Sequence, residues 1–327
     1  MSRRLTIFAL AALATSASLS AQTRTTKLEA VSGIPNVDQS TQTEDIRFKS
    51  DQSDRMTVPV TLGGKGPYRF LVDTGADRTA ISRELANGLK LAAGDEASLH
   101  SISGVSTIDT VTVPTLQLTR KEIRNINAPL LASQNMGADG ILGTDSLRFQ
   151  RVMFDFQAQT LSVVPSAAPD FKAEPGTIVV EGVRKNGRLV VTEATANGRS
   201  LTVIVDTGSQ VSVGNAALRK ALLGAKVLGP SEQVILESVT GDKINGDYMT
   251  VKELQIGGVT LKDLAIVFAN AHTFKQLGFE KQPALLLGMN AMRAFKKVSI
   301  DFASRKLRVV LPEHSSIEAV RLASARL

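Results

Sequence analysis

Two Asp-Thr-Gly tripeptides are the residues of this chain best suited to do chemistry. The first spans residues 73–75 and follows the apolar run FLV; the second spans 206–208, follows VIV and lies 133 positions further along. A single copy is most simply an ordinary turn, in which the aspartate accepts backbone N–H groups and the glycine adopts a positive φ. Two copies, each at the end of an apolar strand pattern, favour a shared function instead.

Two carboxylates held a few ångströms apart can do acid–base chemistry without a metal. Their repulsion leaves one proton shared between them over a range of pH. The charged member can take a proton from water while the protonated member polarises a carbonyl, so that water adds to a peptide bond. Asp73 and Asp206 are therefore the candidate catalytic residues.

Such a pair needs close positioning, and the rest of each tripeptide is suited to provide it. We expect Thr74 and Thr207 to tie the two turns together by hydrogen bonds from hydroxyl to backbone. Gly75 and Gly208 lack a Cβ, so their backbone N–H groups can approach the carboxylates closely.

The sequence around each tripeptide repeats, which predicts two similar, strand-rich lobes. "VPVTLGGKGPYRFLVDTGAD" from Val58 matches "VTEATANGRSLTVIVDTGSQ" from Val191 without a gap. A helix capped by Ser82 or Asn215 is predicted next, then two strands around a glycine-bearing turn, and finally an apolar strand, a short helix and a closing hairpin. If a pseudo-twofold axis relates the lobes, equivalent strand ends bring the two aspartates to one point.

Composition divides the remainder of the chain. Arg3 and Arg4, an apolar run too short to span a bilayer, and small residues up to Ala21 form the pattern of a secretory signal peptide. We therefore expect a periplasmic or secreted protein with no stable membrane insertion after signal removal. The predicted boundaries are a signal peptide at 1–21, a flexible leader at 22–50, lobes at 51–165 and 177–312, a linker at 166–176, and a tail at 313–327 that is a short helix or frayed.

Several other functions are disfavoured. The chain has no cysteine, which excludes disulfides and thiol chemistry, and with 4% aromatic residues it is poorly suited to nucleic acid despite a net charge of +7. Its histidines, at 100, 272 and 314, lack ligand spacing, so we expect no metal and no cofactor. Asp139 and Asp145 indicate a turn and a helix cap rather than a calcium site.

These motifs resemble those of aspartic proteases of the pepsin and retropepsin kind, and most of all the bacterial retropepsin-like group. The resemblance covers residues 51–312 and includes an apolar-apolar-Gly strand in each half, "ILG" at Ile141 and "LLG" at Leu286. It implies a mostly β fold of two homologous closed β-barrel lobes, related by a pseudo-twofold axis and each with a few short helices. It also implies that Asp73 and Asp206 are catalytic and that Thr74 and Thr207 brace them.

The resemblance further implies a flap in each half that covers an extended peptide. Pepsins have one working flap with a tyrosine nearby, whereas the first hairpin here has none and Tyr248 is on a strand of the second. Whether one or both hairpins close therefore stays open. The candidate flap and substrate-binding residues are Ser103, Gly104 and Val105 in the first half and Thr240 and Gly241 in the second.

The two turns continue differently, with Ala76-Asp77 in the first copy and Ser209-Gln210 in the second. Ser209 is a candidate support for the dyad, because its hydroxyl can donate to a carboxylate and favour the charged form. This predicts that Asp206 is the more readily ionised member and that Asp73 holds the proton.

The sequence as a whole predicts an exported aspartic endopeptidase that acts as a monomer, with both lobes in one chain and a peptide or protein as substrate. Two alternatives remain. One is a non-catalytic peptide-binding protein with a degenerate acid-protease fold. The other is an obligate oligomer in which lobes of different molecules pair.

Overall fold

The computed structural model describes residues 26–28, 44–47, 49–50, 56–118, 121–168, 174–224, 228–312 and 320–321. The predicted signal peptide lies outside the described residues, as do most of the predicted leader and tail. The leader contributes the backbone of three short strands and the tail that of one. These are β1 (Thr26–Leu28), β2 (Glu44–Arg47), β3 (Lys49–Ser50) and β26 (Val320–Arg321).

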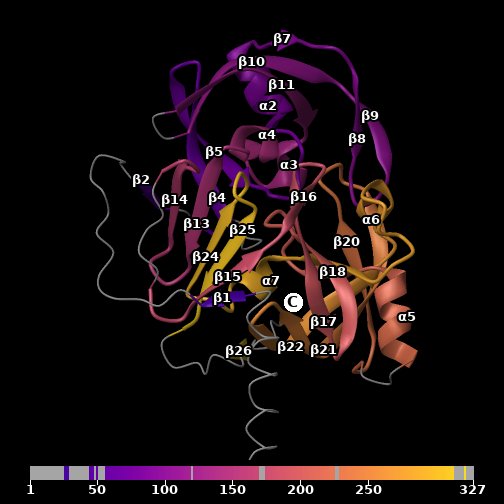
Figure 1. Cartoon of the computed structure of the whole chain (residues 1–327). Coiled ribbons are helices and arrows are strands. Elements are labelled where there is room, and N and C mark those ends of the chain that lie inside the picture. Colours follow the sequence, from indigo (N-terminus) through magenta and orange to yellow (C-terminus); the bar gives the residue numbers. More distant parts are fainter. Residues whose placement is uncertain are drawn as a thin grey trace, which may run out of the picture.

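The first lobe, most of which lies in the upper half of Figure 1, is a closed ring of six strands. The ring closes because β10 pairs with β4 in addition to β11, with Leu116 opposite Leu62. Apolar side chains such as Phe70 and Leu116 fill it and are almost fully buried. In order around the ring, the strands are β4 (Met56–Leu62), β5 (Lys65–Val72), β12 (Gly140–Leu142), β6 (Ala80–Ser82), β11 (Lys121–Leu131) and β10 (Thr110–Leu118).

The second lobe repeats this ring strand for strand. Its closure is the pairing of β21 with β17, and its parallel pair β18–β23 corresponds to β5–β12 of the first lobe. The chain is thus mostly β-structure in two homologous closed barrels, which confirms the predicted fold class. The strands are β17 (Arg188–Ala196), β18 (Arg199–Val205), β23 (Ala284–Leu287), β19 (Ser212–Gly214), β22 (Val259–Ala269) and β21 (Lys243–Ile256).

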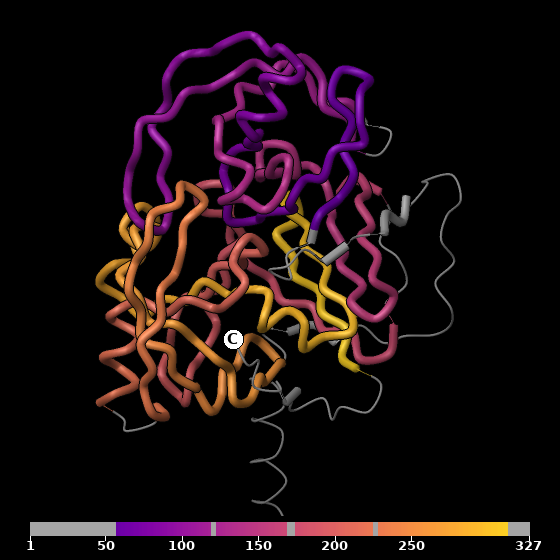
Figure 2. Tube along the Cα trace, turned by 180° about the vertical axis from the view of Figure 1, so that it is seen from behind, coloured from indigo at the N-terminus to yellow at the C-terminus, as the bar shows by residue number. Residues whose placement is uncertain are grey.

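A third sheet joins the two halves. The closing hairpin of each repeat was expected to complete its own lobe, but β13 of the first half pairs with β24 of the second, with Val152 opposite Ile300. Figure 2 shows these strands side by side at the flank of the lobes. The sheet order is β1, β15 (Thr177–Glu181), β25 (Lys306–Val310), β24 (Lys297–Asp301), β13 (Gln150–Asp155), β14 (Thr160–Pro165) and β2.

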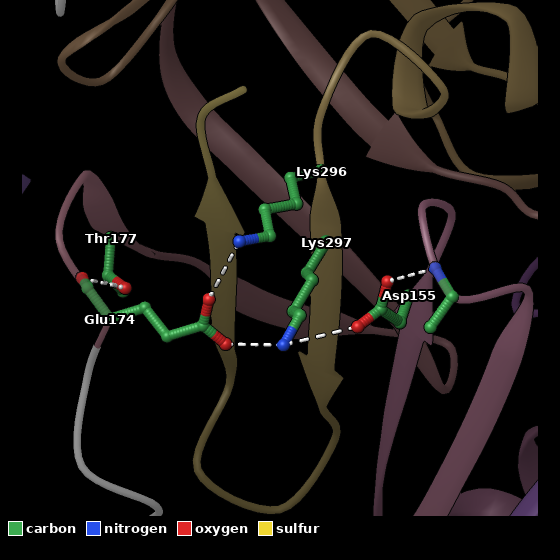
Figure 3. Close-up of polar contacts among 6 residues, drawn as sticks. Asp155, Glu174, Thr177, Lys296 and Lys297 are labelled. Atoms are coloured by element: carbon green, nitrogen blue, oxygen red, sulfur yellow. Dashed lines mark hydrogen bonds and ion pairs between the residues drawn. The ribbon is translucent and has the colours of Figure 1, made fainter. Parts of the chain in front are cut away.

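Charged side chains fasten the segment between the lobes to this sheet (Figure 3). Lys297 lies between two carboxylates, 3.1 Å from Asp155 Oδ2 and in contact with Glu174, while Lys296 Nζ lies 3.5 Å from Glu174 Oε2. Burial alone lowers the pKa of Lys297, but hydrogen bonds to Glu174 and Asp155 and the charges of both raise it overall. The cluster is thus a paired set rather than an isolated buried cation.

The helices are short, and each contacts strands of the fold. Ser82 Oγ accepts from Leu85 N at 3.1 Å and Asn215 Oδ1 from Leu218 N at 2.8 Å, so the two predicted caps are confirmed. The helices are α2 (Arg83–Leu89), α3 (Ser133–Met136), α4 (Thr144–Leu147), α5 (Ala216–Gly224), α6 (His272–Gln276) and α7 (Met289–Met292). The remaining strands are β7 (Ala92–Ala93), β8 (Ala97–His100), β9 (Val105–Ile108), β16 (Val183–Lys185) and β20 (Glu232–Glu237).

Candidate active site

The two Asp-Thr-Gly turns lie at equivalent strand ends of the two barrels. Asp73 follows β5, and its backbone N–H donates to Leu142 O of β12 at 3.0 Å. Asp206 follows β18, and its N–H donates to Leu287 O of β23 at 3.1 Å. In each lobe the parallel strand pair therefore carries one aspartate out of the buried core.

Thr74 and Thr207 tie the turns together by reciprocal hydrogen bonds. The N–H of Thr74 donates to the hydroxyl of Thr207 and the N–H of Thr207 to the hydroxyl of Thr74, both at 3.0 Å. Each hydroxyl then donates across the interface, from Thr74 to Val205 O at 2.9 Å and from Thr207 to Val72 O at 2.7 Å. Both side chains are buried, so these bonds are shielded from competing water.

Each carboxylate lies against the glycine of the opposite turn. A Cβ added to Gly75 would lie 2.4 Å from Asp206 Oδ1, and one added to Gly208 would lie 2.3 Å from Asp73 Cγ. Real Cβ atoms do not make such contacts, so only glycine fits at either place. The structure thus brings Asp73 and Asp206 together at the interface of the lobes.

Backbone donors hold both carboxylates. Asp73 Oδ1 accepts from the N–H groups of Gly75 at 2.8 Å and Ala76 at 3.0 Å. Asp206 Oδ1 accepts from Gly208 N at 3.0 Å. These bonds orient the carboxyl groups, and those to Asp73 favour its charged form.

The pKa of Asp206 is raised from 3.8 to about 7. Burial is the largest cause, and the charge of Asp73 adds to it, while the charge of Arg188 and hydrogen bonds from the Gly208 and Ser209 backbone act in the opposite direction. Burial and the Asp73 charge thus favour the protonated form of Asp206, and the two carboxyl groups titrate as a pair.

The side-chain contact that favoured a charged Asp206 in the sequence-based prediction is not formed. The Ser209 hydroxyl was expected to donate to a carboxylate and make Asp206 the ionised member, but it donates to Val211 O at 2.7 Å. Without that donor, burial and the neighbouring Asp73 charge control Asp206. Ser209 contributes through its backbone rather than its side chain.

Arg188 is a site residue that the sequence did not reveal. It starts β17 in the second lobe, its side chain is 5% exposed, and its Nε donates to Gly75 O of the first lobe at 2.7 Å. Its Nη1 lies 2.8 Å from Asp77 Oδ1, although the two atoms are not aligned as a directed hydrogen bond. Burial raises the pKa of Asp77, and the Arg188 charge opposes that rise. The signal available in the sequence was Asp77 itself, an acid beside the first turn that requires a partner.

The predicted flaps are two hairpins. In the first, β8 and β9 are joined by a turn in which Ser101 N donates to Gly104 O at 2.8 Å. In the second, β20 and the start of β21 are joined by a turn in which Ser238 N donates to Asp242 O at 2.8 Å. Gly241 has a φ of 87°, a conformation that favours glycine.

Both flaps reach the opposite lobe. Ile102 of the first packs against an apolar cluster of the second lobe, and Val239 of the second packs against a cluster of the first. The first flap also approaches α6 (Figure 1), where Ile102 O accepts from His272 N at 2.8 Å. The question that the sequence left open is answered for this conformation, since both hairpins are closed.

The predicted tip residues make contacts within and between the flaps and do not line the space beneath them. Ser103 Oγ donates to Asp242 Oδ2 at 3.1 Å, and Thr240 Oγ1 donates to the same oxygen at 2.7 Å. Gly104 shapes its turn, and Val105 is 53% exposed. The flap residues that line the space beneath instead include Leu99, His100, Ser101 and Ile102 in the first flap and Leu236 and Val239 in the second.

A cavity of about 650 Å³ lies between the flaps and the dyad. Both aspartates line it, as do apolar side chains of each barrel such as Ile141 and Val213. Its walls come from both lobes and both flaps, and its volume and mixed polarity suit a bound peptide segment.

The acids and histidines outside the dyad make structural contacts. Asp139 Oδ2 accepts from Arg69 N at 2.7 Å, and Asp145 Oδ1 accepts from Thr79 N at 2.9 Å. The predicted helix cap at Asp145 is wrong, because the N-cap of α4 is Gly143, without a side-chain cap, and Asp145 lies in the first turn. His100 and His272 contact each other, while residue 314 lies outside the described residues. Among the residues that the structure describes, no three His, Cys, Asp or Glu side chains group as a metal site.

None of the helices in the described part of the chain has the length and apolar character needed to cross a membrane.

The fold and the paired turns define a two-lobed acid protease architecture. A model of the aspartyl protease family matches residues 58–146 and again residues 192–291, one match in each lobe and together more than half of the chain. The chain therefore belongs to this aspartyl protease family. No curated protein matches the chain with statistical significance.

Proposed function

We propose that the chain is an exported aspartic endopeptidase that hydrolyses peptide bonds with Asp73 and Asp206. The observation that carries the proposal is the placement of both carboxylates against each other's turn, in a cavity covered by two flaps. Membership of the aspartyl protease family supports peptide hydrolysis. The signal-like residues 1–21 support a periplasmic or secreted location.

The first half of the reaction is the addition of water. Asp206 holds the shared proton, because its pKa is about 7, and Asp73 is the charged member. Asp73 takes a proton from water, the water oxygen bonds to the scissile carbonyl carbon, and Asp206 gives its proton to the carbonyl oxygen. The product is a neutral tetrahedral diol, with Asp73 now protonated and Asp206 charged.

The second half is breakdown of the diol. Asp73 gives its proton to the amide nitrogen, Asp206 takes a proton from one hydroxyl group, and the C–N bond breaks to give a carboxylic acid and an amine. The dyad returns to its starting state, so no metal, cofactor or covalent intermediate takes part. Since both aspartates belong to one chain, a monomer is sufficient.

The test is peptide cleavage between pH 3 and 8 by the mature protein and by Asp73→Asn and Asp206→Asn. Both variants should lose at least a thousandfold in kcat, on the scale of acid–base groups that act as a unit. Asp109→Asn is the matched control, because Asp109 is an exposed acid that pairs with Arg83 at 3.0 Å. A statine-type transition-state mimic should inhibit the parent protein.

Three results would contradict the proposal. Cleavage that survives either dyad substitution would exclude the dyad. Binding of peptides without cleavage by the parent would favour the non-catalytic binding protein. Elution of the active species as an oligomer in size-exclusion chromatography would exclude the monomer.

A further inference from the structure

The two ends of the cavity differ at one equivalent pair of positions. Arg78 is the fifth residue after Asp73, and Val211 is the fifth residue after Asp206. Both line the cavity, Arg78 with an exposed side chain and Val211 half-buried. The repeat thus places a cation and an apolar side chain at corresponding points on either side of the dyad.

Arg78 is a cation of the cavity wall that lowers the pKa of Asp77 through its charge but forms no ion pair with it. Asp77, its neighbour, is already paired with Arg188 at 2.8 Å, and Glu237 of the second flap lies 4.0 Å from Lys243. The Arg78 side chain forms no ion pair and no hydrogen bond with any of the described residues. An arginine in this state offers a planar set of donors that matches a carboxylate.

The other end of the cavity is apolar and carries no matching cation. Val211 packs with Ile102 of the first flap and Leu236 of the second against the apolar cluster of the second lobe. Gln210, the counterpart of Asp77, is neutral. A charged substrate group placed there would lose water without gaining a partner.

We propose that the cavity end at Arg78 binds a carboxylate of the substrate and that the end at Val211 binds an apolar side chain. The inference rests on the proposed peptidase function and assigns its substrate class. The carboxylate is either an aspartate or glutamate side chain or the C-terminus of the peptide. An extended peptide presents alternate side chains to such pockets, so one residue suffices for recognition.

The test uses peptides that share one scissile bond and differ at a single position on either side of it, with Glu, Gln, Lys or Leu there. Each is made with a free and with an amidated C-terminus. When the position on one side of the bond is varied, the parent should cleave the Glu peptide with a kcat/KM about tenfold higher than that for the Gln peptide, because a charge-assisted pair forms with Arg78. When the position on the other side is varied, the parent should cleave the Leu peptide fastest. A preference that follows only the free C-terminus would identify that carboxylate as the source.

Three variants test whether Arg78 causes the preference for Glu over Gln. Arg78→Val should abolish the preference for Glu over Gln, Arg78→Lys should restore part of it, and Val211→Arg should create it on the other side of the bond. Arg148→Val is the control, since Arg148 is exposed over the ring of Phe149 and lies outside the cavity wall.

Failure of this inference and failure of the proposed function give different results. Cleavage of all peptides with equal rates for Glu and Gln would overturn the inference alone. If no peptide is cleaved, the proposed function fails, and calorimetric binding of reduced-bond analogues still compares Glu with Gln. Equal affinities in that measurement would overturn the inference as well.

Discussion

His100 of the first flap and His272 of the second lobe are hydrogen-bonded, with Nδ1 and Nε2 2.9 Å apart. Their rings are stacked with centroids 5.2 Å apart and an angle of 19° between planes. One nitrogen must donate and the other must accept, so the bond exists only while at least one ring is neutral. The closed flap is thus linked to a proton equilibrium.

We expect this flap to open as the pH falls. Burial lowers the pKa of His272, and the positive charges of His100 and Lys275 lower it further. Another charged group near this pair is Asp77 of the first lobe, which interacts electrostatically with His100. A lowered histidine pKa means that the closed state favours the neutral ring, so the contact is present above the ordinary value near 6.5 and is lost as pH falls through the lowered value.

Hydrogen-exchange protection of residues 97–108 measures this opening. In the parent, protection should decrease as the pH falls below the ordinary histidine pKa of 6.5, after correction for the intrinsic rate. In His272→Gln, whose amide can bond but does not titrate, protection should not change over this range. Constant protection in the parent would show that the histidine pair does not control the flap.

We expect Asp206 to set the alkaline limit of the proposed activity. Its pKa is raised to about 7, so the single-proton state of the dyad is lost as pH rises through that value, and kcat/KM should fall there. The same raised pKa means that folding favours the protonated acid, so stability is lost between pH 3.8 and about 7. Asp206→Asn should therefore melt at a higher temperature than the parent at pH 8 and at nearly the same temperature at pH 3.5.

Thr207→Val should damage the dyad brace without changing side-chain volume much. It removes the acceptor of Thr74 N–H and the donor to Val72 O, both buried. A buried polar group left without a partner costs about 1–3 kcal/mol of unfolding free energy, and kcat should fall because the carboxylates lose their fixed positions. Thr207→Ser keeps both bonds and should retain most of the activity and stability, as denaturant titration and initial rates would show.

Arg188→Gln should move the alkaline limb of the pH–rate profile to higher pH. The Arg188 charge lowers the pKa of Asp206, so its removal raises that pKa further. Asp77→Asn, which removes the ion-pair partner but keeps the cation, should not raise the limb. A double-mutant cycle in urea would give the coupling energy of the pair, and a value of zero would show that Arg188 acts through Gly75 O alone.

The barrels and the dyad could be predicted because the same sequence patterns occur in both halves of the chain. Apolar alternation before each Asp-Thr-Gly, the caps at Ser82 and Asn215 and the glycine-tipped hairpins are all local patterns. Local patterns fix strands and turns, and the repeat fixes which of them correspond. The reciprocal threonine bonds then follow once the two turns meet.

The rest depended on contacts between distant residues. The hairpin alternation at 150–165 suits a strand in any sheet, so the pairing of β13 with β24 could not be read from it. A serine hydroxyl rotates to the nearest acceptor, and for Ser209 that acceptor is the backbone of Val211. Arg188 lies 113 positions from Gly75, and no local pattern connects the two.

The sheet that contains β13 and β24 affects how the cavity can bind a peptide. When two identical chains build a groove, every substitution appears twice, and the groove presents the same surface to a peptide from either end. Here β13 and β24 join two halves of one chain, so Arg78 and Val211 can differ. A peptide and the same peptide turned end to end are then different ligands, and we expect the cavity to distinguish the two chain directions.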